Sequence, residues 1–267
     1  MTWADLFDHH ADIPREKLRW WLSDRLDLPL TSLPLAQSPS KELQKAFEDA
    51  ATRLRRGEPV QYVCGHAPFR ALNLRVNPRV LIPRPETEYL VQIALDRLVR
   101  PGDRILDVGT GSGCIALAIK SERPTCQVEG RDVSEDALSV ARDNAARLKL
   151  DVPFRQADLL SDEPDHAWDL IIANLPYVGE REREALPSDV RDHEPGLALF
   201  AGPDGTDLVL KLMDQARRVL TPGGYLLLET GETQRAVYEA AARRLGWRLE
   251  GLNDLAGRER FWILTLA

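Results

Sequence analysis

Cysteine is scarce in this chain, and the three it has, Cys64, Cys114 and Cys126, are not spaced like the ligands of a metal site. An odd number of cysteines also argues against a disulfide framework, so we expect a cytoplasmic protein without a metal. No basic, apolar leader opens the sequence, and no apolar run approaches the ~20 residues of a membrane span. We therefore expect neither a signal peptide nor contact with a membrane.

Positive charge is also in deficit. The 267 residues carry 35 Lys and Arg against 42 Asp and Glu, a formal net charge of −7. Proteins that hold nucleic acid broadly present a basic surface, so we do not expect direct nucleic-acid binding. The length and the 43% of hydrophobic residues suit one large domain, or two smaller ones, with a buried core.

Three successive patterns divide the chain. Residues 1–60 carry apolar side chains at helical spacing, which predicts a small helical domain that either docks a protein substrate or is a structural cap. Residues 61–82 contain short apolar pieces punctuated by Gly, Asn and Pro, at 61–63 and 72–76, which predict a β-hairpin linker. Residues 83–267 alternate strand and helix patterns, which is typical of a doubly wound α/β sheet.

The strands of this third region end at polar residues or turns. We predict strands at 104–108, 127–132, before Asp158, at 168–174, at 225–229 after a turn at 221–224, and a final pair near 247–249 and 261–264. The segment 179–189, rich in Arg and Glu, is expected to be either a mobile loop that orders with substrate or a plain solvated loop.

The apolar run 168–173 predicts a short buried strand, which is ended abruptly by Asn174, Leu175, Pro176 and Tyr177. Pro176 has no N–H and keeps Leu175 extended, so the carbonyls of Asn174 and Leu175 should be fixed and free. Ligands bind at that edge of an open α/β sheet. The Asn174 side-chain oxygen beside a free carbonyl gives two acceptors that suit an NH2 group, with the Tyr177 ring to stack on it. An ordinary Asn turn at a strand exit is the alternative.

A glycine-rich turn follows strand 104–108 and indicates a ligand close to the backbone. The turn consists of Gly109, Thr110, Gly111, Ser112 and Gly113. A dinucleotide fingerprint would have a further glycine where Cys114 stands. Asp107 would repel a pyrophosphate but can meet a cation or an amine, and Asp132 ends the next strand, where an acid can hold ribose hydroxyls. A ribose and a positive amino-acid moiety without phosphate indicate S-adenosylmethionine rather than NAD.

Two further segments are candidates for the same site. Asp158 and Leu159 end a third strand at this sheet edge and are placed to bracket an adenine, although an ordinary strand end is as consistent with them. In segment 81–88, Pro85 suits the first position of a helix, and Glu86 suits the positive end of the helix dipole. A capped helix start leaves Arg84, between two prolines, without an explanation.

The chain resembles the class I methyltransferases, and more closely the protein-(glutamine-N5) methyltransferases of peptide chain release factors, the HemK/PrmC family. The resemblance spans nearly the whole chain and rests on residues 81–88, 107–113, 132–134, 174–177 and 190–195. It implies a Rossmann-like domain with a seven-stranded sheet. It also implies a monomer that transfers a methyl group from S-adenosyl-L-methionine to the glutamine of the Gly-Gly-Gln motif of release factors, tuning translation termination.

The same resemblance implies roles for single residues. The amide of the substrate glutamine would be held by Asn174 and the Leu175 carbonyl, with Pro176 and Tyr177 beside it and with no metal and no separate base. Asn174 would also face the cofactor. The family usually has Asn-Pro-Pro-Tyr, so Leu175 replaces a proline. A second set would brace the loop, the favoured role, or dock the substrate: Arg84, Glu86, Arg191 and Glu194.

Three alternatives stay open. A related enzyme could methylate a glutamine of a ribosomal protein, because it would share most of these motifs. An adenine-N6 methyltransferase of nucleic acid would use the same two-acceptor logic on an exocyclic NH2, but the acidic charge balance disfavours it. A catalytically silent binding module would keep the cofactor fold alone, and the intact glycine turn with Asp132 and Asn174 disfavours that.

Overall fold

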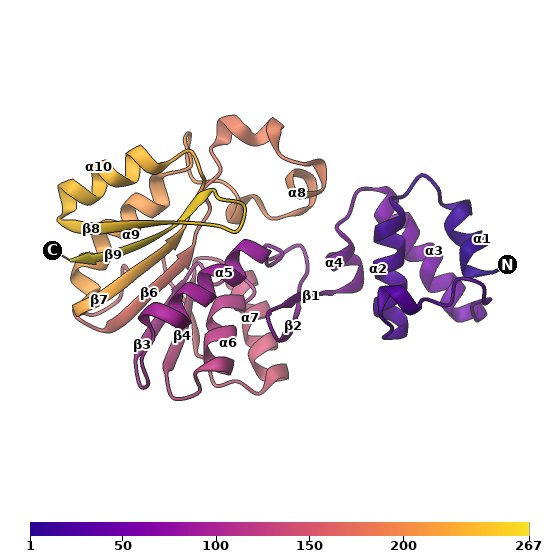
Figure 1. Cartoon of the computed structure of the whole chain (residues 1–267), viewed down its shortest axis with the longest axis horizontal. Coiled ribbons are helices and arrows are strands. Elements are labelled where there is room, and N and C mark those ends of the chain that lie inside the picture. Colours follow the sequence, from indigo (N-terminus) through magenta and orange to yellow (C-terminus); the bar gives the residue numbers. More distant parts are fainter. Residues whose placement is uncertain (267) are drawn as a thin grey trace. The chain divides into compact units, whose positions relative to one another are not determined.

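The computed structural model of the chain describes residues 1–266, and its contacts divide them into two compact units. The first unit, here called the helical unit, contains Met1–His66 together with Leu186–His193. The second, here called the sheet unit, contains Ala67–Ala185 and the chain from Glu194 onward. Figure 1 shows the helices and strands of each unit. No helix within residues 1–266 is long and apolar enough to cross a membrane.

The helical unit is built from short capped helices around an aromatic core. Thr2 caps the first helix in a capping box with Asp5, and Ser40 caps the third. The apolar residues at helical spacing are buried in this core or pack against it, and the ring of Phe47 stacks on that of Phe7 with the ring centres 5.7 Å apart. Its elements are α1 (Trp3–His9), α2 (Arg15–Leu26), η1 (Leu30–Ser32), α3 (Lys41–Arg55), α4 (Val60–Cys64) and, from the distant segment, α8 (Ser188–His193).

The strand predicted at residues 61–63 is wrong, because these residues form helix α4. Pro59 precedes the helix with an extended backbone, and Gly65 ends it in the left-handed region at φ +84°. The Pro and Gly that suggested strand punctuation are therefore a helix start and a helix stop. The hairpin itself is shorter and later in the chain, β1 (His66–Phe69) and β2 (Leu72–Arg75).

The sheet unit has the predicted seven-stranded sheet, in the order β5-β4-β3-β6-β7-β9-β8. Neighbours from β5 to β7 run parallel, and β9 runs antiparallel to both β7 and β8. The strands are β3 (Arg104–Val108), β4 (Gln127–Asp132), β5 (Phe154–Gln156), β6 (Trp168–Asn174), β7 (Leu220–Glu229), β8 (Trp247–Asn253) and β9 (Glu259–Leu266).

Helices cover both faces of this sheet (Figure 1). Alternate strand residues point to opposite faces, so Ile105 joins one apolar cluster and Leu106 the other. The first cluster lies under α5 (Pro85–Ile93), the π-helical turn η2 (Ala94–Leu98), α6 (Cys114–Glu122) and α7 (Glu135–Leu148). The second lies under α9 (Asp207–Val219) and α10 (Arg235–Leu245).

Two local predictions in this unit need correction. The turn at 221–224 does not precede β7 but lies inside it, because the pairing with β6 jumps from Leu220 to Tyr225 across one residue of β6. The segment 179–189 is not a plain loop, since it forms η3 (Glu180–Ala185) and the start of α8. In η3 the Arg183 guanidinium lies 3.8 Å from the centre of the Phe200 ring. Phe200 belongs to residues 194–206, here called the return segment, which contain η4 (Gly196–Ala198) and lead into α9.

Candidate active site

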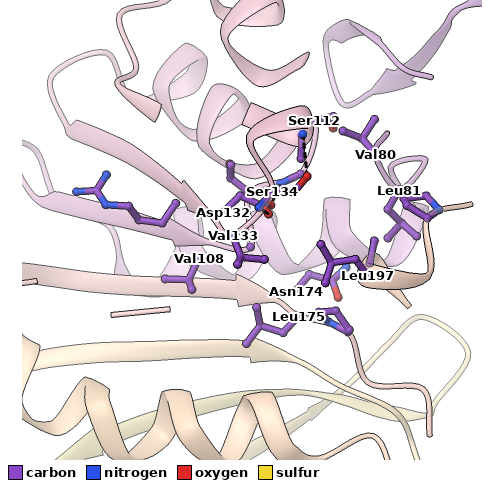
Figure 2. A pocket seen from close by; sticks show the side chains of 18 of the residues that line it. Val80, Leu81, Val108, Ser112, Asp132, Val133, Ser134, Asn174, Leu175 and Leu197 are labelled. Atoms are coloured by element: carbon purple, nitrogen blue, oxygen red, sulfur yellow. Dashed lines mark hydrogen bonds between the residues drawn. The ribbon is translucent and has the colours of Figure 1, made fainter. Parts of the chain in front are cut away.

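A cavity of about 380 Å³ lies at the carboxyl edge of the parallel strands of the sheet unit (Figure 2). This volume is in the range of small-molecule sites. Its walls come from the ends of β3, β4 and β6, from segment 79–87 and from η4. Most residues predicted for a cofactor or substrate line it: Arg84, Gly109, Thr110, Gly111, Ser112, Asp132, Asp158, Leu159, Asn174, Leu175 and Pro176.

The glycine turn after β3 forms the floor of the cavity. Gly109 and Gly111 have φ of +73° and +55°, which side chains rarely adopt. The N–H groups of Gly109 and Thr110 donate to the Arg131 carbonyl at 2.8 and 2.9 Å, which ties the turn to β4. A Cβ atom on Gly109 would lie 2.7 Å from Leu175 Cδ2. Glycine is therefore required for the turn to meet the end of β6 at this distance.

Asp132 links the glycine turn to the next helix. Its Oδ2 accepts from the Gly111 N–H at 2.9 Å, and its Oδ1 accepts from the Ser134 N–H at 2.9 Å. Ser134 in turn caps α7, as predicted from the sequence. Burial raises the pKa of the Asp132 carboxyl, and the backbone N–H groups oppose this rise. A carboxylate oriented by two backbone donors thus stands at the cavity wall.

Asp107 lies beneath the turn rather than in the cavity wall. It is fully buried, and its Oδ2 accepts from Thr110 Oγ1 at 2.6 Å and from the Ala116 N–H at 3.1 Å. Its Oδ1 has no hydrogen-bond partner within residues 1–266. Burial raises the pKa of Asp107 to about 7. In this position the side chain supports the glycine turn from beneath. Gly113 likewise lies outside the wall and begins helix α6.

The cavity fits an adenosine-type ligand without phosphate. Three arginines line it, and a carboxylate faces each: Asp136 is 3.9 Å from Arg79, Glu194 is 2.6 Å from Arg84 and Glu163 is 2.7 Å from Arg131. The charges of Arg84 and Arg131 are thus balanced within the protein rather than offered to a phosphate, whereas the Arg79–Asp136 pair is exposed to solvent.

The remaining wall of the cavity is apolar and includes Val133 and Leu197, which are 51% and 61% exposed (Figure 2). Leu159, at φ +53°, is buried beside them, and Asp158 is exposed and paired with Lys211 at 2.6 Å. These surfaces suit the flat face of a base, while Asp132 suits hydroxyl groups.

Asn174, the last residue of β6, has an oriented side chain. Its Nδ2 donates to Thr87 Oγ1 at 2.8 Å, and Thr87 Oγ1 donates to Glu229 Oε2 at 2.9 Å. Within residues 1–266 no hydrogen-bond donor reaches Asn174 Oδ1 or the Leu175 carbonyl. Two acceptors that no protein donor reaches therefore belong to adjacent residues at the strand end, and both residues line the cavity.

Tyr177 lies behind the cavity wall rather than in it. Burial raises the pKa of its hydroxyl to about 12. Its carbonyl accepts from Gln234 Nε2 at 2.8 Å, and the same Nε2 donates to the Asp204 carbonyl at 3.2 Å. Gln234 therefore holds the exit of β6 against the return segment.

The four candidate bracing residues fall in different places. Arg84 donates to Glu194 at 2.6 Å, and Glu194, whose side chain is 1% exposed, also accepts from the Ile82 N–H at 3.3 Å. These contacts fix segment 82–84 to the start of the return segment. Glu86 is exposed in the first turn of α5. Arg191 belongs to the helical unit, where its guanidinium contacts Asp192 at 2.8 Å.

Sequence reasoning missed four polar side chains of this site: Thr87, Asn144, Glu229 and Gln234. Asn144 is fully buried, and its Nδ2 donates to the carbonyls of Ser112 and Arg75, both at 3.0 Å, so that it ties the glycine turn to the hairpin. Glu229 had a usable signal, because it ends β7 at the same sheet edge as Asn174. Thr87 stands inside the quoted segment 81–88, but the sequence does not reveal that it faces Asn174.

Comparison with known proteins agrees with this geometry. Residues 2–65 match the PrmC N-terminal domain family, and residues 100–245 match a methyltransferase domain family. A solved methyltransferase from Pyrococcus furiosus shares the fold, with a TM-score of 0.57 and 22% identity over 73% of this chain and 88% of that one.

Two curated relatives are both release factor glutamine methyltransferases. The Koribacter versatilis protein is 42% identical over 83% of this chain and 81% of its own length. The Salmonella typhimurium protein is 41% identical over 81% of this chain and 79% of its own length. With this identity over most of both chains, the protein belongs to the release factor glutamine methyltransferase family.

Proposed function

We propose that this enzyme methylates the side-chain amide nitrogen of a glutamine in peptide chain release factors, the substrate that its relatives are named for. The observation that carries the proposal is the pair of acceptors, Asn174 Oδ1 and the Leu175 carbonyl, in the wall of the cavity. A primary amide has two N–H donors, and two adjacent acceptors match them. In a Gly-Gly-Gln loop the two residues before the glutamine have no side chains. Such a loop could therefore bring the glutamine into the cavity without blocking it.

The cofactor is S-adenosyl-L-methionine. When bound, it supplies a methyl group on a positively charged sulfur. We propose that Asp132 holds the ribose hydroxyls, that Leu159 and Val133 contact the base, and that the glycine turn lets the ligand lie against the backbone. The buried carboxylate of Asp107 adds negative potential under that turn, which favours a positively charged ligand.

The residues at the end of β6 would act by positioning. An amide nitrogen is a weak nucleophile because its lone pair is delocalised into the carbonyl. Accepting both N–H groups fixes the plane of the amide and adds electron density to the nitrogen. Orientation and preorganised acceptors then supply most of the rate, and Pro176 keeps the strand exit rigid. Tyr177, behind the wall, would hold this exit in place through its contacts.

The helical unit would dock the protein substrate. Its core is separate from that of the sheet unit, and the whole cavity is lined by the sheet unit. We propose that the docking domain extends through helix α4, beyond the predicted boundary at residue 60, and that the hairpin β1–β2 leads from it into the methyltransferase domain. We also propose that the enzyme acts as a monomer, as the resemblance to this family implies.

Methyl transfer from labelled S-adenosyl-L-methionine tests the proposed substrate. Purified release factors, ribosomal proteins and DNA are offered in parallel, and the labelled residue is located by mass spectrometry. We expect label on one release-factor glutamine. Label on a ribosomal-protein glutamine or on adenine, with release factors unlabelled, would refute the proposal in favour of one of those substrates.

The placement of the cofactor is tested with Asp132→Ala. Losing a charge-assisted acceptor should weaken S-adenosyl-L-methionine binding by roughly 1.5–3 kcal/mol. Asp143→Ala is the control, since this exposed carboxylate on α7 pairs only with Arg75 at the surface. Calorimetry that finds the same cofactor affinity in a folded Asp132→Ala protein and in the control would rule out the proposed role.

A further inference from the structure

Three side chains from three elements form one hydrogen-bonded row behind the acceptor pair. Asn174 ends β6, Thr87 lies in the first turn of α5, and Glu229 ends β7. The bonds from Asn174 Nδ2 to Thr87 Oγ1 and from Thr87 Oγ1 to Glu229 Oε2 measure 2.8 and 2.9 Å. Thr87 and Glu229 are 2% and 1% exposed. A buried carboxylate is costly for a fold, so its place behind the site calls for a role.

The row has only one direction when Glu229 is ionised. A carboxylate can only accept hydrogen bonds, so the Thr87 hydroxyl must donate its single hydrogen to Glu229. What Thr87 then offers to Asn174 is a lone pair. A lone pair attracts the NH2 end of the Asn174 amide and repels its oxygen. The charge on Glu229 thus decides which end of Asn174 is turned away from Thr87 and left for a ligand.

We propose that Thr87 and Glu229 are positioning residues that keep Asn174 Oδ1, rather than Nδ2, available to the substrate amide. This rests on the proposed function, because it assumes that Asn174 accepts a hydrogen bond from the substrate. A flipped Asn174 would present two N–H donors to the N–H groups of glutamine. Donor would then face donor, and one of the two acceptors that fix the amide would be lost.

The charges around Glu229 give the row a pH dependence. Burial, together with the nearby charge of Glu86, raises the pKa of Glu229 to about 7, although the hydrogen bond from Thr87 and the charges of Arg260 and Arg84 oppose this rise. Tyr177 and Cys114 also interact with this carboxyl, and both stay neutral at these pH values because burial raises the pKa of each to about 12. A protonated Glu229 can donate to Thr87, whose own hydrogen is then free to turn toward Asn174. Turnover should therefore fall as the pH drops through the pKa of Glu229.

Single-turnover methyl transfer to a release factor at saturating cofactor measures the role of Thr87. Thr87→Val keeps the shape and removes the hydroxyl, and we expect about tenfold slower transfer, the effect of losing one hydrogen bond. Affinity for S-adenosyl-L-methionine should not change, and Thr87→Ser should recover most of the rate. Thr221→Val is the matched control, because Thr221 donates to Asp169 over the same 2.9 Å at the other end of β7. It should lose stability without losing rate.

Two further measurements separate positioning from a structural role. In an Asn174→Ala background, Thr87→Val should cost no additional rate, because the row acts only through Asn174. Glu229→Gln should be slower than the wild type and should lose the acid limb of the pH–rate profile, since an amide does not titrate. If Thr87→Val proves too unstable to assay, the pH–rate profile of Glu229→Gln still tests the proposal, because this variant preserves the packing and removes only the titrating group.

The proposal is overturned if the Thr87→Val loss persists in full without Asn174, or if Glu229→Gln keeps the acid limb. It is also overturned if Thr87→Val is as fast as Thr221→Val. Each of these results can occur in an enzyme that methylates release-factor glutamine normally, so each leaves the proposed function standing. A wild-type protein that modifies no glutamine would instead refute the proposed function, and the row with it.

Discussion

At the scale of single residues, the side chain and the backbone of Leu175, at the end of β6, have different roles. The Leu175 side chain is 4% exposed and belongs to the core cluster under α9 and α10, where it also meets Gly109. Leu175 also lines the cavity, and we propose that its carbonyl is the part that meets the substrate. Within residues 1–266 no group accepts a hydrogen bond from its N–H. A proline, which the family usually has here, would keep the carbonyl and lose only the apolar packing.

We therefore expect Asn174→Ala and Leu175→Pro to behave very differently. Asn174→Ala removes one preorganised acceptor and should lower turnover by ~10²–10³-fold, with a much smaller change in cofactor affinity. Leu175→Pro retains both acceptors and should stay active, with some loss of stability from the vacated apolar volume. Steady-state kinetics on a release factor measures both variants. An active Asn174→Ala beside an inactive Leu175→Pro would disprove the two-acceptor mechanism.

At the scale of elements, the sequence predicted regular strands and long helices well but short irregular segments poorly. Strands β3, β4 and β6 lie at the predicted residues, because buried apolar runs between turn signals leave few alternatives. Helix α4 was missed because five residues are too few for a helical period to be recognised. The excursion inside β7 was read as a separate turn, because only pairing with β6 shows that the strand has already begun.

The candidate site was predictable to the same extent and for the same reason. The carboxyl ends of parallel strands lie at one edge of the sheet however the helices pack, so Asp132 and Asn174 could be predicted from the order of strands and helices alone. Thr87 and Glu229 act through a contact between α5 and β7, elements more than 100 residues apart. Local sequence carries no information about which side of α5 meets which strand. Contacts of that kind are set by tertiary packing.

The Arg84–Glu194 pair is the contact that joins segment 82–84 to the return segment. Arg84→Gln should cost about 3 kcal/mol of unfolding free energy, because the carboxylate stays buried after its cation is removed. Glu194→Gln should cost less, about 1 kcal/mol, since the guanidinium it leaves is 31% exposed and can be hydrated. Urea denaturation measures both. Arg75→Gln, at an exposed pair with Asp143, is the control and should cost below about 1 kcal/mol. Equal losses of unfolding free energy in all three variants would show that the buried Arg84–Glu194 pair stabilises the fold no more than an exposed pair does.

At the scale of the whole molecule, two separate stretches of the chain form the helical unit. Leu186–His193 lies between the strand end that carries Asn174 and the Glu194 that pairs with Arg84, yet it belongs to the helical unit. There Asp189 lies 3.6 Å from Lys17, and His193 Nε2 is 3.1 Å from the Arg56 carbonyl. The segment that follows the site strand is thus held by the unit proposed to dock the substrate.

Removal of residues 1–65 tests that division of labour. Cofactor affinity should survive, because every residue that lines the cavity belongs to the sheet unit, which has its own core. Methylation of an intact release factor should collapse, since the docking surface is gone and segment 186–193 has lost its support. A short glutamine peptide needs no such docking and should react at a similar rate with both proteins. Asp189→Asn in the full-length chain is the control, because it removes only the contact with Lys17. If the folded, cofactor-binding truncation modifies the intact release factor at the full rate, the helical unit is a structural cap and takes no part in choosing the substrate.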